Sequence, residues 1–458
     1  MLEILLLFVL LFLCLAIPFA LLQIPRLKAS LAAKHASHEQ RPRTWMRRLM
    51  GAGAMAASPI YGFAFPLAAI PAAAAVFVKP LAGWPVRTKA LIGWSLAGIL
   101  ALVFSALYQG QEISGNILHY AAMALFVCAA VRLTAGEASA AQLLGYASIG
   151  SALFFVVFRP KNTDTFEHMW KYGLGPYVAI AAVWLACSLT ERRLLAMLAL
   201  LAVGSASLFL GFRSHGLVCF VTVVLLMFQS KTRKGKLPLV RIVAAGGALL
   251  GLYKLLPAAV AAGVFGEAVR LRTLNQLDDS GPALLAGRVE PPLSIAAIME
   301  KPWFGWGNLN GIDLDTLGVA RNIAYELGML PEAYERLWVR EEGRVSVHSL
   351  LGEGWAEGGI VSAALPLLLL GIFIAAAFKV RGNWAPLVIL VSAQGCWDVV
   401  FSTWGYNRAM VLAFSAVLAA WAISKSRDEI AQADGLGDSR VSNKPKGGQR
   451  RPYSSVLR

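Results

Sequence analysis

Apolar runs about twenty residues long recur along almost the whole chain, from Leu2 to Ser424. A helix of about that length crosses a hydrocarbon core roughly 30 Å thick. Hydrophobic residues make up 57% of the 458 residues and charged residues 15%, whereas soluble domains carry about 25% charged residues. We therefore predict an all-α fold, a polytopic transmembrane helical bundle. The same composition excludes soluble enzymes, secreted disulfide scaffolds, disordered chains and outer-membrane barrels.

The apolar runs predict about twelve or thirteen membrane spans. The segment 51–79 is broken by Pro59, Pro66 and Pro71 and has basic residues at both ends, so we expect a hairpin of two short segments there. A single crossing of this segment would make the count about twelve. The other predicted spans are 2–22, 90–107, 117–132, 140–158, 175–190, 193–211, 214–229, 239–265, 350–378, 384–404 and 406–424.

The net charge of +16 is concentrated in short segments between or after the apolar runs. Such basic segments face the cytoplasm in membrane proteins, which predicts that the N-terminus lies outside. They lack the runs of stacking aromatic residues that a nucleic-acid groove needs, so the predicted partner is the lipid bilayer and no nucleic acid. The basic segments are Arg26–Arg48, Lys79–Lys89, Lys231–Arg241, Lys379–Arg381 and Lys425–Arg458.

Four regions follow from this pattern. Residues 1–265 form the N-terminal transmembrane helices, and residues 349–424 form the C-terminal ones. Between them, 266–348 form one large, partly helical extracytoplasmic loop with eight basic and twelve acidic residues, and loops of this length are usually functional. Residues 425–458 form a basic cytoplasmic tail that we expect to be disordered.

The cysteines give no sign of a metal site. All five lie inside apolar runs, and no two have the Cys-x-x-Cys spacing. We therefore expect neither a disulfide framework nor a bound metal.

Ionisable residues near membrane depth are costly to bury and mark candidate functional sites. Arg213 and His215 lie at a junction between two spans on the predicted outer side, and Arg408 and Asp398 flank the last outer turn. A guanidinium at such a position can bind an anion, although an arginine at a helix end also extends into the headgroup region without any ligand. For Arg213 both interpretations remain open.

Three further candidates lie in or beside the predicted loop. Arg288 is one of its eight basic residues, which by itself favours a solvated charge or a pair with Glu290. His348 lies where the loop re-enters the membrane; an imidazole titrates near neutral pH and suits a general base, although a lone histidine is more often structural. Glu357 lies about two and a half helical turns further on and either binds substrate or pairs at the end of the span.

Three stretches carry a resemblance to a known family. Gly287-Arg288 followed by Lys301-Pro302-Trp303-Phe304-Gly305-Trp306-Gly307 is similar to a signature in which Gly-Arg precedes a proline and a Gly-x-Gly turn in a large periplasmic loop. His348-Ser349 followed by Glu357-Gly358-Gly359 resembles a re-entry motif, and Ser205–Leu225, centred on Arg213, resembles an arginine-bearing pair of spans. Together these stretches resemble the O-antigen ligase and Wzy-type O-antigen polymerase superfamily of bacterial envelope glycosyltransferases.

The resemblance implies transfer of an undecaprenyl-diphosphate-linked oligosaccharide to a sugar hydroxyl of an acceptor glycan or glycolipid. The reaction would occur at the outer leaflet of the bacterial inner membrane, with inversion and without metal or cofactor. The resemblance implies that Arg213 and Arg288 stabilise the diphosphate leaving group and that His348 takes the hydroxyl proton. Glu357, His215 and Arg408 are the expected substrate-binding residues. A flippase and a chain-length regulator are the implied protein partners.

Three functions remain open from the sequence. The leading one is a polysaccharide polymerase, whose donor and acceptor are both lipid-linked repeat units. An O-antigen ligase, whose acceptor is lipid A-core, is the first alternative. A lipid-linked sugar flippase or transporter is the alternative from another class, and it would favour polar residues spread through the span centres and repeat symmetry between the halves of the chain.

Overall fold

The computed structural model describes residues 41–55, 57–60, 63–80, 83–160, 163–229, 289–330, 347–405 and 407–424, with isolated positions between 247 and 274 and between 338 and 345. The predicted span at 2–22, most of the one at 239–265, Arg288 and the tail at 425–458 lie outside the described residues.

Long apolar helices dominate the described chain, as in a multi-pass helical membrane protein. Five stretches are long and apolar enough to cross a membrane, and four apolar helices are shorter. The five are α6 (Val86–Gln109), α7 (Asn116–Leu133), α8 (Glu137–Phe158), Phe166–Leu189 and α18 (Leu350–Lys379). The shorter four are α11 (Arg193–Phe209), α12 (Arg213–Phe228), α19 (Ala385–Phe401) and the helix Arg408–Ser424. Each predicted span between 90 and 229 and between 350 and 424 therefore coincides with a helix.

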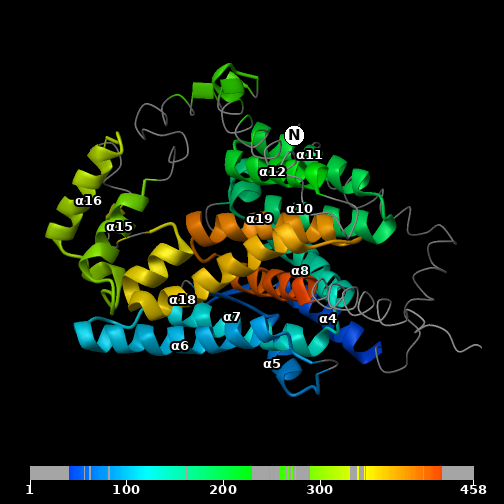
Figure 1. Ribbon diagram of the computed structural model, residues 1–458, viewed down its shortest axis with the longest axis horizontal. Coiled ribbons are helices and arrows are strands. Elements are labelled where there is room, and N and C mark those ends of the chain that lie inside the picture. The colour runs from blue at the N-terminus through cyan, green and yellow to red at the C-terminus, as the bar shows by residue number, and fades with distance from the viewer. Residues whose placement is uncertain are drawn as a thin grey trace, which may run out of the picture.

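The stretch Phe166–Leu189 has three parts: α9 (Phe166–Met169), the π-helical turn η2 (Trp170–Leu174) and α10 (Gly175–Leu189). Figure 1 shows α6 and α7 along one edge of the bundle and α11 and α12 along the opposite edge, with α18, α19 and α10 between them. Helix α18 packs against both α6 and α19, and α10 packs against α8, α11 and α19.

Glycines allow the helices to approach aromatic rings closely. A Cβ atom on Gly98 of α6 would overlap the ring of Tyr120, and one on Gly145 of α8 would overlap the indole of Trp184. Small residues at helix contacts are typical of membrane bundles, where close van der Waals packing replaces the hydrophobic effect as the main attraction between helices.

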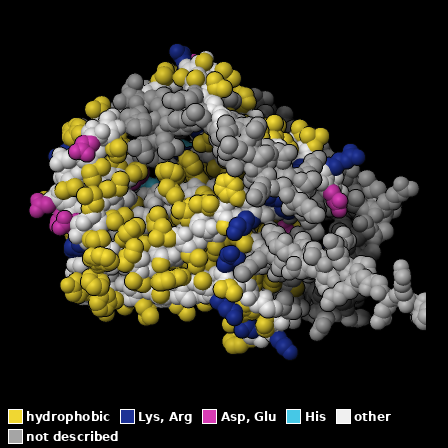
Figure 2. Space-filling model, in the orientation of Figure 1, with side chains coloured by type: hydrophobic (Ala, Val, Ile, Leu, Met, Phe, Trp, Pro, Cys, Tyr) yellow, Lys and Arg dark blue, Asp and Glu magenta, His cyan; other side chains and the backbone are white. Residues whose placement is uncertain are grey.

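The outer surface of the bundle is apolar. Leu96, Leu100, Phe104 and Leu107 of α6 are all exposed. Figure 2 shows that hydrophobic side chains cover a broad area over α6 and α18, and that Lys and Arg side chains gather along its right-hand border. An apolar area of this extent suits hydrocarbon rather than water.

The two ends of the bundle differ. At one end, which we call the loop end, Lys301 Nζ donates a hydrogen bond to Gln109 Oε1 (3.0 Å) and Asn308 Nδ2 to the carbonyl oxygen of Glu112 (3.3 Å). The other end carries Arg132, Arg192 and Arg381, and we call it the basic end. There, Asn383 Nδ2 donates a hydrogen bond to the carbonyl oxygen of Cys187 (2.8 Å). Residues 289–330 of the 266–348 segment therefore dock on the side of the α6–α7 turn.

That part folds into helices of its own, as predicted. They are α15 (Pro291–Glu300), the 3₁₀ turn η3 (Leu309–Gly311) and α16 (Leu314–Glu326). Prolines suit the first turn of α15 because the first helical N–H groups have no intrahelical acceptor. Two tryptophans tie this small unit together, since Trp306 Nε1 donates to the carbonyl oxygen of Ala297 (3.0 Å) and Trp338 Nε1 to that of Val289 (2.7 Å).

Residues 51–79 form two short segments that turn back, as the prolines predict, but not by helices alone. Helix α4 (Arg41–Ala54) leads into an antiparallel hairpin of β1 (Ala57–Ile60) and β2 (Phe63–Pro66), and α5 (Ala69–Val76) follows. This short hairpin is a local exception in an otherwise helical architecture, and the prolines there lack the amide donors that a continuous helix would need.

Both ends of this element lie at the basic end of the bundle. Arg47 Nη1 donates to the carbonyl oxygen of Leu133 (3.2 Å), and Arg132 Nη1 donates to the carbonyl oxygen of Val78 (2.6 Å). We call residues 41–78 the re-entrant element, since it enters the bundle and returns to the same end.

Candidate functional site

Helix α18 is broken at Gly359, and another segment fills the break. Gly359 has φ 68°, a left-handed conformation that glycine adopts without steric cost. The amide N–H of the next residue, Ile360, donates to the carbonyl oxygen of Pro302 (3.1 Å) rather than to its own helix. Trp355 Nε1 donates to the same carbonyl oxygen (3.0 Å). The Pro302–Gly307 turn is therefore bonded directly into the broken helix.

Two further backbone bonds fix the other side of this turn. Trp306 N donates to the carbonyl oxygen of Ala356 (2.7 Å), and Gly307 N donates to that of Glu357 (2.8 Å). Two of the three stretches that carry the family resemblance thus meet in space. The sequence indicates only that the glycine-rich segment shapes the loop, not that it docks on α18.

The Glu357 side chain is buried beneath this turn, with 4% of its surface exposed. Its Oε2 accepts hydrogen bonds from Ser114 Oγ (2.6 Å) and from Asn116 Nδ2 (2.7 Å). Its backbone carbonyl oxygen also accepts a bond from Ser105 Oγ (2.8 Å). Donors to a buried carboxylate offset its desolvation. Glu357 therefore joins α18 to the α6–α7 turn, and these partners occupy one of its two oxygens.

His348 lies immediately before α18 and faces Glu290. The His348 Nδ1 and Glu290 Oε1 atoms are 2.5 Å apart, with side-chain exposures of 35% and 10%. The contact has the distance of an ion pair but not the angle of a hydrogen bond. A carboxylate beside Nδ1 favours the tautomer that carries its proton on Nδ1, so the opposite nitrogen, Nε2, can accept a proton. The sequence suggests Glu290 as a partner of Arg288, but Arg288 lies outside the described residues.

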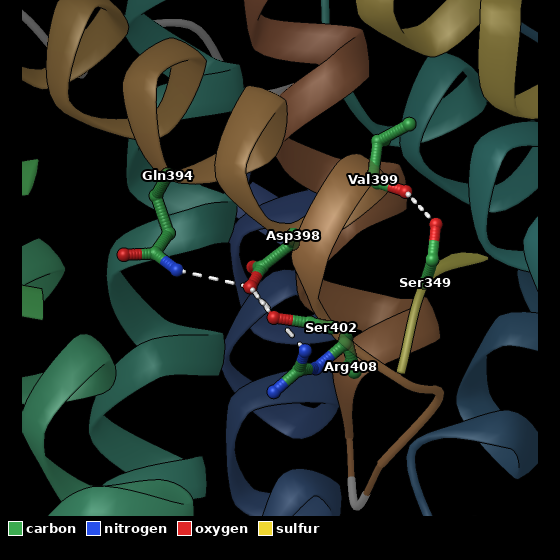
Figure 3. A network of polar contacts seen from close by, with 6 residues as sticks. All are labelled: Ser349, Gln394, Asp398, Val399, Ser402 and Arg408. Carbon is green, nitrogen blue, oxygen red and sulfur yellow. Dashed lines mark hydrogen bonds and ion pairs between the residues drawn. The ribbon is translucent and has the colours of Figure 1, made fainter. Parts of the chain in front are cut away.

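The start of α18 touches the end of α19. Ser349 Oγ accepts a bond from Gly352 N (2.9 Å), which caps α18, and lies 3.4 Å from the carbonyl oxygen of Val399. Figure 3 shows Ser349 beside Val399, with Asp398 and Arg408 close by. His348 is therefore one residue from a contact with the segment that carries Asp398.

Asp398 is the centre of a polar network (Figure 3). Its Oδ1 accepts hydrogen bonds from Gln394 Nε2 (3.0 Å), Ser402 Oγ (2.9 Å) and Arg408 Nη1 (3.3 Å). The Arg408 side chain is 27% exposed, and Asp398 is its one acceptor among the described residues. Because a guanidinium carries five N–H donors, most of them remain available to a ligand.

A cavity that is open to solvent lies beside this network. Lys171, Asp398 and Arg408 supply charged groups to its wall, and His215 reaches it from α12. Lys171 belongs to the π-helical turn η2, and such turns are frequent at functional sites. Another part of the wall is apolar and is formed by Ile180, Val391, Val411 and Leu412.

The bonds of His215 define its tautomer. Ser207 Oγ donates its single proton to the carbonyl oxygen of Val203 (2.8 Å) and accepts a bond from Trp170 Nε1 (3.0 Å). His215 Nδ1 lies 2.9 Å from the same hydroxyl oxygen. Because the Ser207 hydroxyl proton is donated to the Val203 carbonyl oxygen, the bond between Ser207 and His215 requires a proton on Nδ1, which donates to the hydroxyl oxygen. The other ring nitrogen lies 3.9 Å from Cys219 Sγ.

The structure brings part of the predicted site together. His215 and Arg408 line one cavity, and Arg213 begins the helix that carries His215. His348 adjoins this region through Ser349, whereas Glu357 lies in the separate cluster beneath the Pro302–Gly307 turn. Sequence reasoning missed Lys171 as a cavity residue; the glycines that follow it, Gly173 and Gly175, are the available signal of an irregular helix there.

Among the described residues, no group of three or more His, Cys, Asp or Glu side chains could hold a metal ion. Comparisons with family models, with curated proteins and with solved structures found no match to this chain.

Proposed function

We propose that this protein is a membrane glycosyltransferase of the O-antigen polymerase and ligase type. It transfers an undecaprenyl-diphosphate-linked oligosaccharide to a sugar hydroxyl at the outer leaflet of the bacterial inner membrane. Polymerisation of lipid-linked repeat units is the leading form of this activity, and transfer to lipid A-core is the alternative. The observation that carries the proposal is the cavity, whose wall carries the charged groups of Lys171, Arg408 and Asp398 in one part and is apolar in another.

A polyprenyl diphosphate needs both kinds of wall. Its diphosphate carries negative charge that increases as the sugar leaves, and guanidinium and ammonium groups in a shielded site stabilise that charge. Arg408 and Lys171 supply two such groups in the cavity. Arg213 and Arg288 are expected to add charge at the leaving group, as the resemblance implies. The prenyl chain would lie against Ile180, Val391 and Leu412.

His348 is the base in this proposal. Its Nε2 accepts the proton of the attacking hydroxyl, and the Glu290 carboxylate beside Nδ1 stabilises the imidazolium that forms. The hydroxyl oxygen then forms a bond to the anomeric carbon as the carbon–phosphate oxygen bond breaks, and the electron pair leaves with the diphosphate. A single displacement of this kind inverts the anomeric centre. Glu357 supports the site from below by holding the Pro302–Gly307 turn.

The orientation in the proposal follows from charge. The basic end carries Arg132, Arg192 and Arg381 and faces the cytoplasm. The loop end, with α15, α16 and His348, then faces outward, where a lipid-linked donor is delivered. A flippase that supplies the donor and a chain-length regulator are the partners expected of such an enzyme.

The test is deletion of the gene followed by gel analysis of surface glycans and lipid-linked intermediates. Single repeat units that persist while long chains disappear would support a polymerase. Lipid-linked polymer that accumulates beside uncapped lipid A-core would support a ligase. If neither pool changes in a strain that lacks a redundant enzyme, the glycosyltransferase proposal is wrong and transport becomes the leading function.

A further inference from the structure

Helix α4 of the re-entrant element penetrates the bundle beside α8. Its 14 residues span about 21 Å. A Cβ atom on Gly150 of α8 would overlap the carbonyl oxygen of Gly51, so the two backbones are in direct contact. Helix α4 ends at Ala54, which is fully buried. Ala54 lies seven residues beyond Arg47, about 10 Å further along the helix from the contact of Arg47 with the basic end of the bundle.

The end of α4 meets the turn between α19 and the helix Arg408–Ser424. Asn407 Nδ2 donates a hydrogen bond to the carbonyl oxygen of Ala54 (3.0 Å). Asn407 has φ 57°, one of two non-glycine residues with positive φ among the described residues, and it is 2% exposed. Its own carbonyl oxygen accepts a bond from Val411 N (3.1 Å). Asparagine tolerates the left-handed conformation better than most residues.

Arg408 follows Asn407 directly, so the conformation of Asn407 sets the direction in which the Arg408 side chain leaves the backbone. The single bond from Arg408 to Asp398, at 3.3 Å, is long for a charge-assisted contact and does not by itself fix the guanidinium. The dark-blue helix behind Arg408 in Figure 3 is α4, by the colour bar of Figure 1. The re-entrant element thus supports the backbone on which a cation of the cavity is mounted.

We propose that Asn407 is a positioning residue for Arg408: its side-chain bond to the end of α4 holds the left-handed backbone that directs the Arg408 guanidinium into the cavity. The role of Arg408 as the group that binds the donor diphosphate rests on the proposed function. Through the bond from Asn407 to Ala54, the re-entrant element supports the binding site although it does not contact the ligand.

The test compares three single variants in purified full-length protein in lipid nanodiscs, with undecaprenyl diphosphate as the probe. Asn407→Ala loses both the bond and the tolerance for positive φ, and we expect affinity for the probe to fall about tenfold. Asn407→Gly keeps the backbone conformation but loses the bond, so a smaller loss is expected. Arg408→Gln should lower affinity at least as much as Asn407→Ala.

Asn383→Ala is the matched control. It removes a bond of the same kind, from an asparagine amide to a carbonyl oxygen on a distant helix, but at the basic end of the bundle. We expect it to lower the melting temperature about as much as Asn407→Ala does, with the affinity for the probe unchanged. A purely structural role of Asn407 predicts equal behaviour of the two variants in both measurements.

A double variant separates positioning from general destabilisation. If Asn407 acts through Arg408, Asn407→Ala combined with Arg408→Gln should bind the probe no more weakly than Arg408→Gln alone. Additive losses would overturn the inference, as would unchanged affinity of Asn407→Ala. If the wild-type protein does not bind the probe, the proposed function fails instead, so the two failures are distinguishable.

Discussion

The imidazole of His348 and the carboxylate of Glu290 form the arrangement that most directly links single residues to chemistry. In this arrangement the carboxylate lies beside Nδ1, so Nε2 is the nitrogen left to accept a proton. The ring is only partly buried, so a substrate hydroxyl can reach it. In the proposed mechanism His348 is the general base, and a general base contributes about 10² to 10⁴-fold to a rate.

Glu290→Gln should therefore lower kcat for glycosyl transfer by about 10²-fold, because the amide keeps the shape of the side chain but not the charge that stabilises the imidazolium. Binding of the lipid-linked donor should be unchanged. Glu300→Gln is the control, since Glu300 lies exposed at the end of the same helix, α15. Equal transfer rates for the two variants would remove Glu290 from the mechanism.

A second prediction at this scale concerns Asp313, the N-cap of α16. Hydrogen bonds from Thr316 to the carboxylate, of which the backbone bond measures 2.8 Å, hold the pKa of Asp313 below its usual value. A lowered folded-state pKa means that the contribution of the charge is present above the unfolded pKa of about 3.9 and is lost as the pH falls through the folded pKa. Asp313→Ala should weaken α16 by about 1 kcal/mol at pH 7.

Asp313→Asn separates the cap from the charge, because asparagine caps a helix as well as aspartate does. Amide hydrogen exchange within α16 at pH 7 should therefore increase in Asp313→Ala and change little in Asp313→Asn. The thermal stability advantage of the wild type over Asp313→Asn should decline as the pH falls below about 4 and disappear below the folded pKa of Asp313. An advantage that grew on acidification would contradict the assignment.

Single-sequence reasoning identified candidate residues by type and position but not their partners. His348 and Arg408 are recognisable because ionisable groups at membrane boundaries are costly to bury. Glu290 and Lys171 carry no such signal, since their relevance depends on contacts with segments distant in the chain. The same holds for Ser114 and Asn116, which look like ordinary turn residues in the sequence. Only the structure shows that both donate hydrogen bonds to Glu357.

At the scale of elements, the broken helix α18 determines how the loop unit is attached. Three backbone bonds join the Pro302–Gly307 turn to residues 356–360, and the break at Gly359 makes room for them. Hydropathy predicts one continuous span at 350–378 because the break does not interrupt the apolar run. The Gly358–Gly359 pair is the sequence signal of the break, although a glycine pair within a membrane helix also occurs at close helix contacts.

Gly359→Ala tests whether this attachment is structural. A Cβ atom there would overlap the carbonyl oxygen of Trp303, and alanine adopts φ 68° only with strain. We expect a loss of about 3 kcal/mol or more in the free energy of unfolding. The control Gly371→Ala lies on the same helix with no neighbour near its Cβ position, so it should be neutral or slightly stabilising. The measurement is the melting temperature of both purified variants. Equal melting temperatures would mean that the break at Gly359 does not hold the Pro302–Gly307 turn in place.

At the scale of the whole molecule, the sequence predicts the fold class well because a membrane restricts the available solutions. Apolar runs of fixed length become helices wherever backbone groups have no water to bind, and the described helices follow the runs closely. The re-entrant element is predicted in outline only, because prolines show that a span is interrupted but not how deeply the chain enters. The arrangement of the helices around the cavity depends on side-chain packing between distant segments, which hydropathy does not contain.

The orientation of the bundle gives the last prediction. With the native cysteines replaced, Asp315→Cys in α16 should react with a membrane-impermeant maleimide in intact cells made permeable only at the outer membrane. Glu191→Cys, in the turn before α11, should react only after the inner membrane is opened, because we expect the basic residues of that end to keep it in the cytoplasm. Both positions are exposed, so access to the reagent depends on the side of the membrane. The opposite result would place His348 and the loop end in the cytoplasm, where a donor on the outer leaflet does not reach them, and the proposed reaction would be excluded.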